Sequence, residues 1–126
     1  MIVSVDLSSA VPVFEQLRSQ IELQILAGQL PAGHQLPAIR HLAADLGLAR
    51  GTVAKVYEAL VRDGLVTAQG RHGTVVAQRP QKEQTQHARS VLAEAAHHLA
   101  VLSQQLGIPR AEVHAALDSA MTRFSQ

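Results

Sequence analysis

Residues Leu36 to Val76 read LPAIRHLAADLGLARGTVAKVYEALVRDGLVTAQGRHGTVV, and this stretch decides the fold of the chain. Apolar residues recur at helical spacing, first over Pro37–Leu46 and again over Arg50–Arg62. Only residues 47–49, which begin with a glycine, separate the two segments. Because two short helices joined by a turn of about three residues form a helix-turn-helix, the sequence predicts that unit here.

Two β-prone runs follow the second helix, Leu65–Ala68 and Thr74–Gln78. The segment between them holds two glycines, which predicts a hairpin with a flexible tip. Because an isolated hairpin is only marginally stable, we expect it to pack against the preceding helices as a wing. Gln35 and Leu36 are expected to add a very short strand.

A helix over Pro12–Ala27 is predicted upstream, because proline suits a first helical turn and apolar residues recur at helical spacing after it. Gly28 and the turn at residues 31–33 end this helix. A β-prone start precedes it. The apolar residues of the helix are Phe14, Leu17, Ile21 and Ile25, and those of the start are Ile2, Val3 and Val5.

The last third of the chain has a different pattern. Arg79–Gln86 is polar and contains a proline, so we expect a linker and a domain boundary there. Apolar residues then recur at alternating steps of about four and three, which is typical of helices that pack along a seam. They lie on two helices separated by Gly107 and Pro109: Ala88, Leu92, Ala95, Leu99, Leu102 and Leu106 on the first, and Val113, Leu117, Ala120 and Phe124 on the second.

These patterns predict a mainly α fold with a small β hairpin. A winged helix-turn-helix domain is expected over residues 1–79 and a helical dimerisation region over residues 80–126. Two helices alone have only a thin core, so we expect them to pair with a second copy in a four-helix arrangement; a hairpin within one chain is the alternative. The residues expected at the dimer interface are Leu92, Ala95, Leu99, Leu102, Leu106, Val113, Leu117 and Phe124.

Composition limits what else the chain can be. Its 126 residues suffice for one ordinary domain, or a small domain with a helical appendage, but not for an added large catalytic domain. Hydrophobic residues make up 47% and charged residues 17%, a globular balance, and no apolar run is long enough to span a membrane. The chain has no cysteine, which excludes disulfides, and its N-terminus lacks signal-peptide features. We therefore expect a cytoplasmic protein with no membrane partner.

Positive charge is concentrated in the middle of the chain. Residues 34–79 are net positive, whereas residues 1–33 are net negative and residues 80–126 are balanced. His34, His41 and His72 lie in the same middle segment and add positive charge at lower pH. Because nucleic-acid binding depends on where positive charge lies, this distribution suits it; a solvated face on a near-neutral protein is the alternative.

The second helix of a helix-turn-helix enters the major groove, and its first residues meet base edges. Arg50 can bind guanine O6 and N7, Thr52 can donate a hydrogen bond or contact a thymine methyl, and Lys55 can neutralise a phosphate. Taken singly, a cationic side chain on an exposed helix face is usually solvated and contacts no ligand. Together they favour DNA contact, and the predicted DNA-binding residues are Arg40, Arg50, Gly51, Thr52, Lys55, Arg71, His72 and Gly73. Tyr57 is instead predicted to be a core residue with a polar tip.

The same stretch resembles the GntR family of bacterial transcription regulators. The family pattern contains P-G-x-x-L-P-S-x-R, then L-A-x-x-L-G-V-S-R-x-T-V, and a wing that ends in G-x-G-T-F-V. This chain matches it in register over about residues 11–77, and its short two-helix C-terminal part is similar to that of the YtrA subfamily. The resemblance implies that Arg40, Arg50, Thr52 and the wing tip contact operator DNA. The matching segments are Pro31-Ala32-Gly33, Leu36-Pro37-Ala38-Ile39-Arg40, Leu42-Ala43, Leu46-Gly47-Leu48-Ala49-Arg50-Gly51-Thr52-Val53 and Gly73-Thr74-Val75-Val76.

Several positions depart from the family pattern. Ala38 and Ala49 replace serines, and at Ala49 this removes the expected N-cap of the recognition helix, worth about 0.5–2 kcal/mol. Ala54 stands where the family often has arginine, which removes one expected DNA contact. Arg71 replaces the first glycine of the wing motif, so the turn of the wing is expected to differ.

We predict a sequence-specific DNA-binding transcription regulator, a repressor that binds a pseudo-palindromic operator as a homodimer, with a small-molecule effector as a further candidate partner. The alternative is a winged-helix protein-interaction module that dimerises without specific DNA binding. No enzyme is expected, because no glycine-rich phosphate loop follows a strand and the serines lack a histidine and an acid at recognisable spacing. No cofactor or metal is predicted; a divalent metal at Glu94 and His98 is the alternative to a solvated helix face.

Overall fold

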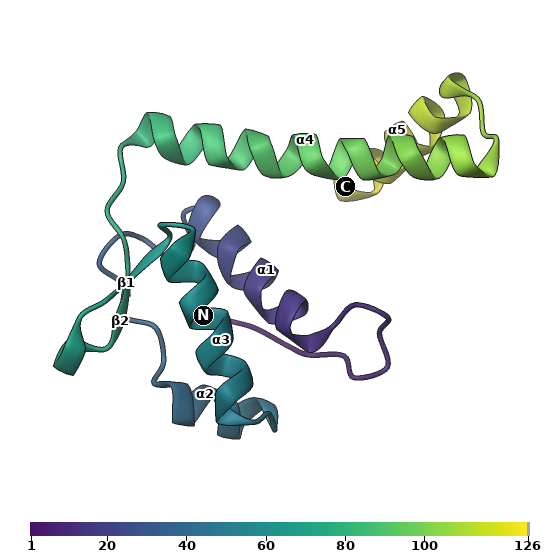
Figure 1. Cartoon of the computed structure of the whole chain (residues 1–126). Helices are drawn as coiled ribbons and strands as arrows, with labels where there is room; N and C mark the ends of the chain where they lie inside the picture. Colours follow the sequence, from purple (N-terminus) through teal and green to yellow (C-terminus); the bar gives the residue numbers. More distant parts are fainter. Residues whose placement is uncertain (126) are drawn as a thin grey trace. The chain divides into compact units, whose positions relative to one another are not determined.

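Six helical segments and one antiparallel hairpin make up the described part of the chain (Figure 1). The computed structural model describes residues 1–125, which fall into two compact units: the first is Met1–Thr85, and the second begins at Gln86. The order of elements confirms the predicted mainly helical fold with a hairpin after the helix-turn-helix and two C-terminal helices. The elements are α1 (Val13–Leu26), α2 (Ile39–Leu46), α3 (Arg50–Arg62), β1 (Val66–Ala68), the 3-10 turn η1 (Gly70–His72), β2 (Thr74–Val76), α4 (Gln81–Leu106) and α5 (Arg110–Phe124).

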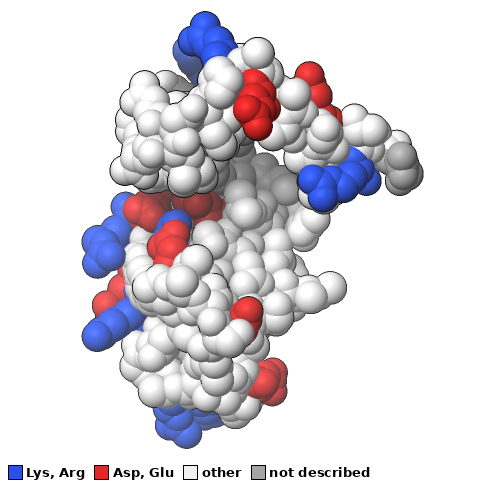
Figure 2. Space-filling view, turned by 90° about the vertical axis from the view of Figure 1, so that its right-hand side faces the viewer, with Lys and Arg blue, Asp and Glu red and all other residues white. Residues whose placement is uncertain are grey.

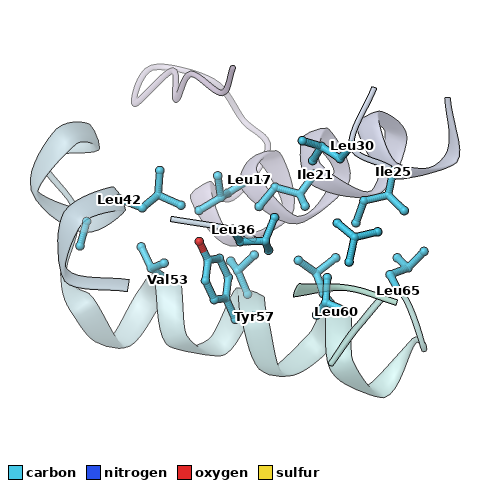
Figure 3. Close-up of a cluster of buried hydrophobic side chains, with 14 residues drawn as sticks. Leu17, Ile21, Ile25, Leu30, Leu36, Leu42, Val53, Tyr57, Leu60 and Leu65 are labelled. Carbon is cyan, nitrogen blue, oxygen red and sulfur yellow. The ribbon is translucent and has the colours of Figure 1, made fainter. Parts of the chain in front are cut away.

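The core of the first unit lies between α1 and α3. Figure 3 shows the side chains of Leu17, Ile21 and Ile25 pointing from α1 toward Val53, Tyr57 and Leu60 of α3. Leu17, Ile21, Val53 and Leu60 have no exposed surface. In both α1 and α3 the buried side chains follow one another at steps of three or four residues, and this spacing places them on a single face of the helix. Burial of one such side chain stabilises the fold by about 1.5–3 kcal/mol.

The short turn between α2 and α3 depends on one glycine. Gly47 has a φ of 67°, in the left-handed region that ends many helices, and the Leu48 N–H donates to the Ala43 carbonyl at 2.9 Å. Leu42 and Ala43 are buried against the core, and Leu46 and Leu48 are half-buried beside it. This turn lets α2 end and α3 begin within three residues, as predicted.

The hairpin is held by a third extended segment. β1 pairs with β2 in antiparallel register, with Val66 opposite Val76. Gln35 forms a bridge with Val75 on the other side of β2, the Leu36 N–H donates to the Thr74 carbonyl at 2.8 Å, and the Val76 N–H donates to the His34 carbonyl at 2.8 Å. The expected short strand at Gln35 is therefore confirmed, and it connects the wing to the chain that leads into α2.

The β-prone start of the chain forms no strand pairing; its backbone binds side chains of α1 instead. Gln16, Gln20 and Gln24 each accept from a backbone N–H and donate to the carbonyl of the same residue, at Asp6, Ser4 and Ile2 respectively, over distances of 2.6–3.4 Å. Four residues of helix rise about 6 Å, and two residues of extended chain span about 6.6 Å, so successive glutamines meet alternate backbone units. The glutamine amides thus take the place of a neighbouring strand.

The prediction of a linker over Arg79–Gln86 is wrong from residue 81 onward, because α4 begins at Gln81. Gln, Lys and Glu favour a helix, and the Gln84 N–H donates to the Pro80 carbonyl at 3.1 Å as the first turn forms. The Gln84 side chain also donates to the Ile25 carbonyl at 3.0 Å. This contact binds the first turn of α4 to the end of α1, so the first unit extends to Thr85.

The second unit contains the rest of α4, a turn and α5. The predicted break at Gly107 and Pro109 is confirmed: the Ile108 N–H donates to the Ser103 carbonyl at 3.0 Å, and Pro109 precedes the first residue of α5. No residue of α4 or α5 is buried among the described residues. In the described part of the chain, no helix combines the length and apolar character that crossing a bilayer requires.

The glutamine contacts generate a stability prediction. Replacing Gln20 with alanine removes two hydrogen bonds to Ser4 and is expected to lower the free energy of unfolding by about 1–2 kcal/mol. Gln29→Ala is the matched control, because the Gln29 side chain is exposed and forms no such bond. Urea unfolding measures both variants. Equal stability of Gln20→Ala and the parent would show that the N-terminal segment does not depend on α1.

Candidate nucleic-acid interface

The first turn of α3 presents polar groups on the face opposite the core. Arg50, Gly51 and Lys55 are exposed, and Thr52 is half-buried. Val53 and Val56, on the other side of the same helix, are fully buried. Because the apolar side of α3 is held against α1, the polar side is left free for a ligand.

The N-termini of α2 and α3 lack side-chain caps. Ala38 precedes α2 and Ala49 precedes α3, and neither provides a side-chain hydrogen bond. Ala49 has the extended backbone of an N-cap residue, with φ −67° and ψ 143°, so the missing cap at this position is confirmed. Uncapped N–H groups at the start of a helix can donate to phosphate oxygens. Both helix starts therefore suit contact with a nucleic-acid backbone.

The cationic side chains predicted to contact DNA are not engaged within the chain. Among residues 1–125, Arg40, Arg50, Lys55 and Arg71 form no ion pair. Figure 2 shows one group of Lys and Arg side chains at its lower end, the end at which Figure 1 places α2 and the start of α3, and further Lys and Arg side chains elsewhere on the same face. These charges are thus available to an anionic partner.

Arg18 shows the opposite behaviour. It binds Glu15 at 2.7 Å and Glu22 at 3.3 Å, and it lies 3.9 Å from Asp63 at the end of α3. The hydrogen bond from Arg18 holds the pKa of the Glu15 carboxyl below its ordinary value. Arg18 therefore serves the packing of α1 against α3, and its charge is neutralised within the fold.

The wing tip has a turn that its two glycines make possible. Gly70 has a φ of 57°, and Gly73 has a φ of 72° with a ψ of −149°, a conformation restricted to glycine. Arg71 and His72 lie between them in η1 and are exposed. Gly70 thus provides the left-handed residue one position before the family's first wing glycine, and Arg71 keeps an ordinary negative φ.

Tyr57 connects α3 to the chain just before α2. Its hydroxyl donates to the Pro37 carbonyl at 2.8 Å, and its ring is buried, so the prediction of a core residue with a polar tip is confirmed. One hollow of about 300 Å³ is lined by Tyr57, Pro37, Ala38 and Arg71, together with Thr74 of β2. The structure therefore brings the wing residue Arg71 beside the start of α2.

The sequence did not predict that Gln35 contacts the wing. Its side chain reaches the wing tip, where Nε2 donates to the His72 carbonyl at 2.9 Å. No local pattern could have indicated this contact, because its two residues are 37 positions apart.

Glu94 and His98 of the second unit are the alternative metal ligands named in the sequence analysis. The Glu94 Oε1 and His98 Nε2 atoms lie 3.8 Å apart on one exposed face of α4. Within residues 1–125, no group of three histidine or carboxylate side chains lies close enough together to hold a metal ion.

A helix-turn-helix with an uncapped, cationic second helix and a basic wing defines the class of winged helix-turn-helix proteins. The family model described as "Bacterial regulatory proteins, gntR family" matches residues 14–76 of this chain. The chain therefore belongs to the GntR family, and these residues form the DNA-binding domain of a transcription regulator. The family is one of regulators and not of enzymes, as predicted.

Relatives in sequence include regulators of similar and of greater length. An HTH-type transcriptional regulator of Mycobacterium tuberculosis is 42% identical over 58% of this chain and 60% of its own length. The MocR regulatory protein of Rhizobium meliloti is 40% identical, but the matched segment is only 15% of its length. The transcriptional repressor YtrA of Bacillus subtilis is 24% identical over 89% of this chain and 86% of its own length. The chain thus spans 60% or less of the first two relatives.

Solved structures share the fold. YtrA of Sulfolobus acidocaldarius, a GntR-family transcription factor, is 33% identical with a TM-score of 0.58, and the match covers 77% of this chain and 99% of that one. A GntR family regulator of Listeria monocytogenes reaches a TM-score of 0.75 at 19% identity, over 89% of this chain and 97% of that one. The similarity to YtrA proteins confirms the subfamily resemblance, including the short helical C-terminal part.

The buried hydroxyl of Tyr57 generates a pH prediction. Burial raises the pKa of Tyr57 to about 12, above the value of about 10 in an unfolded chain. The neutral hydroxyl thus contributes stability that is fully present below about pH 10 and is lost as pH rises toward about 12. Tyr57→Phe should lack this loss and should be about 1 kcal/mol less stable at neutral pH.

The measurement is urea unfolding at several pH values, together with the absorbance of tyrosinate. Tyr57 is the only tyrosine in the chain, so the absorbance reports this residue alone. Ionisation of Tyr57 in the folded protein near pH 10 would contradict the burial argument.

Proposed function

We propose that this chain is a cytoplasmic repressor that binds a pseudo-palindromic operator as a homodimer, with α3 of each copy in successive major grooves. The observation that carries the proposal is the first turn of α3, where Arg50, Thr52 and Lys55 stand on the free side of a helix whose other side is buried. A major groove admits one α-helix, and a guanidinium can bind guanine O6 and N7 together. Half-site centres would lie about one helical turn, or a small multiple of it, apart.

The wing and α2 extend the proposed contact. Arg40 on α2 and Arg71 and His72 in η1 are exposed, and neither arginine has an ion-pair partner within the described residues. We assign Arg40 to the DNA backbone and the wing tip, including Gly73, to the minor groove or phosphates beside the half-site. A solved structure of the DNA-binding domain of AraR in complex with operator ORX1 is similar in fold, with a TM-score of 0.54, which supports the proposal that a domain of this fold binds operator DNA.

The proposed dimer rests on the apolar surface of the second unit. Leu92, Leu99, Leu102 and Leu106 are 71%, 40%, 51% and 62% exposed on α4, and Leu117 is 45% exposed on α5. A surface of this kind is costly in water, and a second copy would cover it by the same mechanism that stabilises helical bundles. The remaining interface residues, Ala95, Val113 and Phe124, continue the same two stripes.

A hollow of about 420 Å³ between α4 and α5 belongs to the same surface. Its apolar lining includes Leu99, Ile108 and Val113, and Arg110 and His114 also line it. Since Leu99 and Val113 are also interface residues, we assign the hollow to side chains of the second copy. A small-molecule effector would then act by competing with these side chains or by changing the separation of the two DNA-binding units.

The DNA contact is tested with Arg50→Ala. Loss of a bidentate contact should cost about 1–3 kcal/mol of binding and relax the preference at one base pair. Lys55→Ala should instead weaken binding to all sequences and reduce the salt dependence by about one ion. Arg62→Ala, at the exposed far end of α3, is the control and should bind like the parent.

Gel-shift titrations with DNA from upstream of the gene, and with duplexes selected from random sequence, give the affinities. Parental binding that ignores sequence would refute the regulator and favour the alternative, a winged-helix protein-interaction module. Specific parental binding with an unchanged Arg50→Ala would refute only the role of Arg50.

The dimer is tested with the double variant Leu99→Gln and Leu102→Gln. It should be monomeric in sedimentation and bind operator DNA weakly, because two buried apolar contacts per subunit are lost. Leu23→Gln is the matched control, since Leu23 is also 51% exposed but lies on α1. A double variant that remains dimeric would place the interface elsewhere.

A further inference from the structure

The side chain of Gln35 forms a bridge between the chain that precedes α2 and the tip of the wing. Gln35 pairs with Val75 through its backbone, and its Nε2 donates to the His72 carbonyl at 2.9 Å. The amide also lies close to Gly73: a β-carbon at that position would be 3.2 Å from Nε2. Gly73 therefore leaves the space that the amide of Gln35 occupies.

The wing tip has internal hydrogen bonds that fix its own turn. The His72 N–H donates to the Gln69 carbonyl at 3.1 Å, the Gly73 N–H to the Gly70 carbonyl at 3.0 Å, and the Gln69 N–H to the Gly73 carbonyl at 2.7 Å. These bonds join residues of the hairpin to one another, so they do not fix where the tip lies relative to α2 and α3. In the described part of the chain, Gln35 alone sends a side-chain hydrogen bond into residues 70–73 from outside the hairpin.

Two observations connect this bridge with the cationic surface. Arg71 follows Gly70 in the same short turn, directly beside the His72 carbonyl that Gln35 binds. Gln35 and Arg71 also line the same hollow of about 300 Å³, together with Pro37 and Ala38 at the start of α2. A change in the Gln35 bond would therefore move Arg71 relative to the helices that bear Arg40 and Arg50.

We propose that Gln35 is a positioning residue for DNA recognition: its amide holds the wing tip so that Arg71 and His72 meet the groove beside the half-site that α3 reads. The inference rests on the proposed DNA binding and adds a role for a residue that itself has no charge. A loop that is held in its bound position before binding loses less conformational freedom when it binds. The bridge thus contributes to affinity through Arg71, without Gln35 touching the DNA.

A double-mutant cycle tests the proposal, with gel-shift affinities for the duplex that the parent prefers. Gln35→Ala should weaken binding about 3- to 10-fold, the effect of one lost neutral hydrogen bond. In an Arg71→Ala background, the same substitution should have little further effect, because the group it positions is gone. Gln35→Glu, which retains the size but cannot donate to a carbonyl, should weaken binding at least as much as Gln35→Ala, because its carboxylate also adds a negative charge beside Arg71.

The matched control is Gln69→Ala. Gln69 is a wing glutamine whose side chain bonds to the Thr67 hydroxyl at 3.2 Å, within the hairpin itself. Its substitution should not change the effect of Arg71→Ala. Gln35→Met retains the length of the side chain without a donor and serves as the second variant if Gln35→Ala unfolds at the temperature of the assay.

The contact with flanking DNA provides a second measurement, and a change in fold stability alone would not alter it. Hydroxyl-radical footprints of Gln35→Ala and Arg71→Ala should lose the same flanking protection, while protection of the half-site by α3 is retained. Additive losses in the double variant, or an intact flanking footprint in Gln35→Ala, would overturn the proposal. Parental binding without sequence preference would refute the proposed function instead, so the two failures are distinguishable.

Discussion

The packing of α1 against α3 is the constraint on which the DNA-facing surface depends. Ile21 and Leu60 are fully buried where the two helices meet, and truncation of such a side chain typically costs about 2–5 kcal/mol. One face of α3 is fixed by this contact, so the rotation of the helix about its axis is fixed as well. Arg50 and Lys55 face outward for that reason, and their arrangement follows from a purely apolar interaction.

Side-chain amides add directional bonds between segments at the edge of the apolar core. Gln16, Gln20 and Gln24 bind the backbone of the N-terminal segment, Gln84 binds the end of α1, and Gln35 binds the wing tip. An amide can donate and accept at the same time, as a peptide group does, and so it can satisfy a backbone that has no neighbouring strand. Only 2% of the residues are aromatic, so the core is almost wholly aliphatic and these directional bonds define its edges.

The two units differ in how far their apolar side chains are buried. The first has a continuous core from α1 to β2, whereas the described part of the second has no buried residue in α5 or in the part of α4 that it contains. Charge follows the same division. Arg18 is neutralised inside the first unit by Glu15 and Glu22, while the cationic residues at the start of α3 have no partner in the described chain. The proposed dimer rests on the exposed leucines, and the proposed DNA contact rests on the unpaired arginines.

The sequence by itself determined the elements and their order. The predicted bounds of α3, Arg50–Arg62, are those of the structure, and α1 differs by one residue at each end, because helical periodicity and glycine stops act over a few neighbouring residues. The candidate residues on α3 could be chosen in the same way, since they all lie within the first six residues of one helix. Their roles in DNA binding stay predictions.

Only the tertiary structure decided which distant groups meet. It showed that the N-terminal segment pairs with glutamines, that α4 begins within the expected linker, and that Gln35 holds the wing tip. Each of these outcomes involves a hydrogen bond between residues 10 to 59 positions apart. A local pattern contains no information about such a partner, because the bond exists only after the apolar core has brought the two segments together.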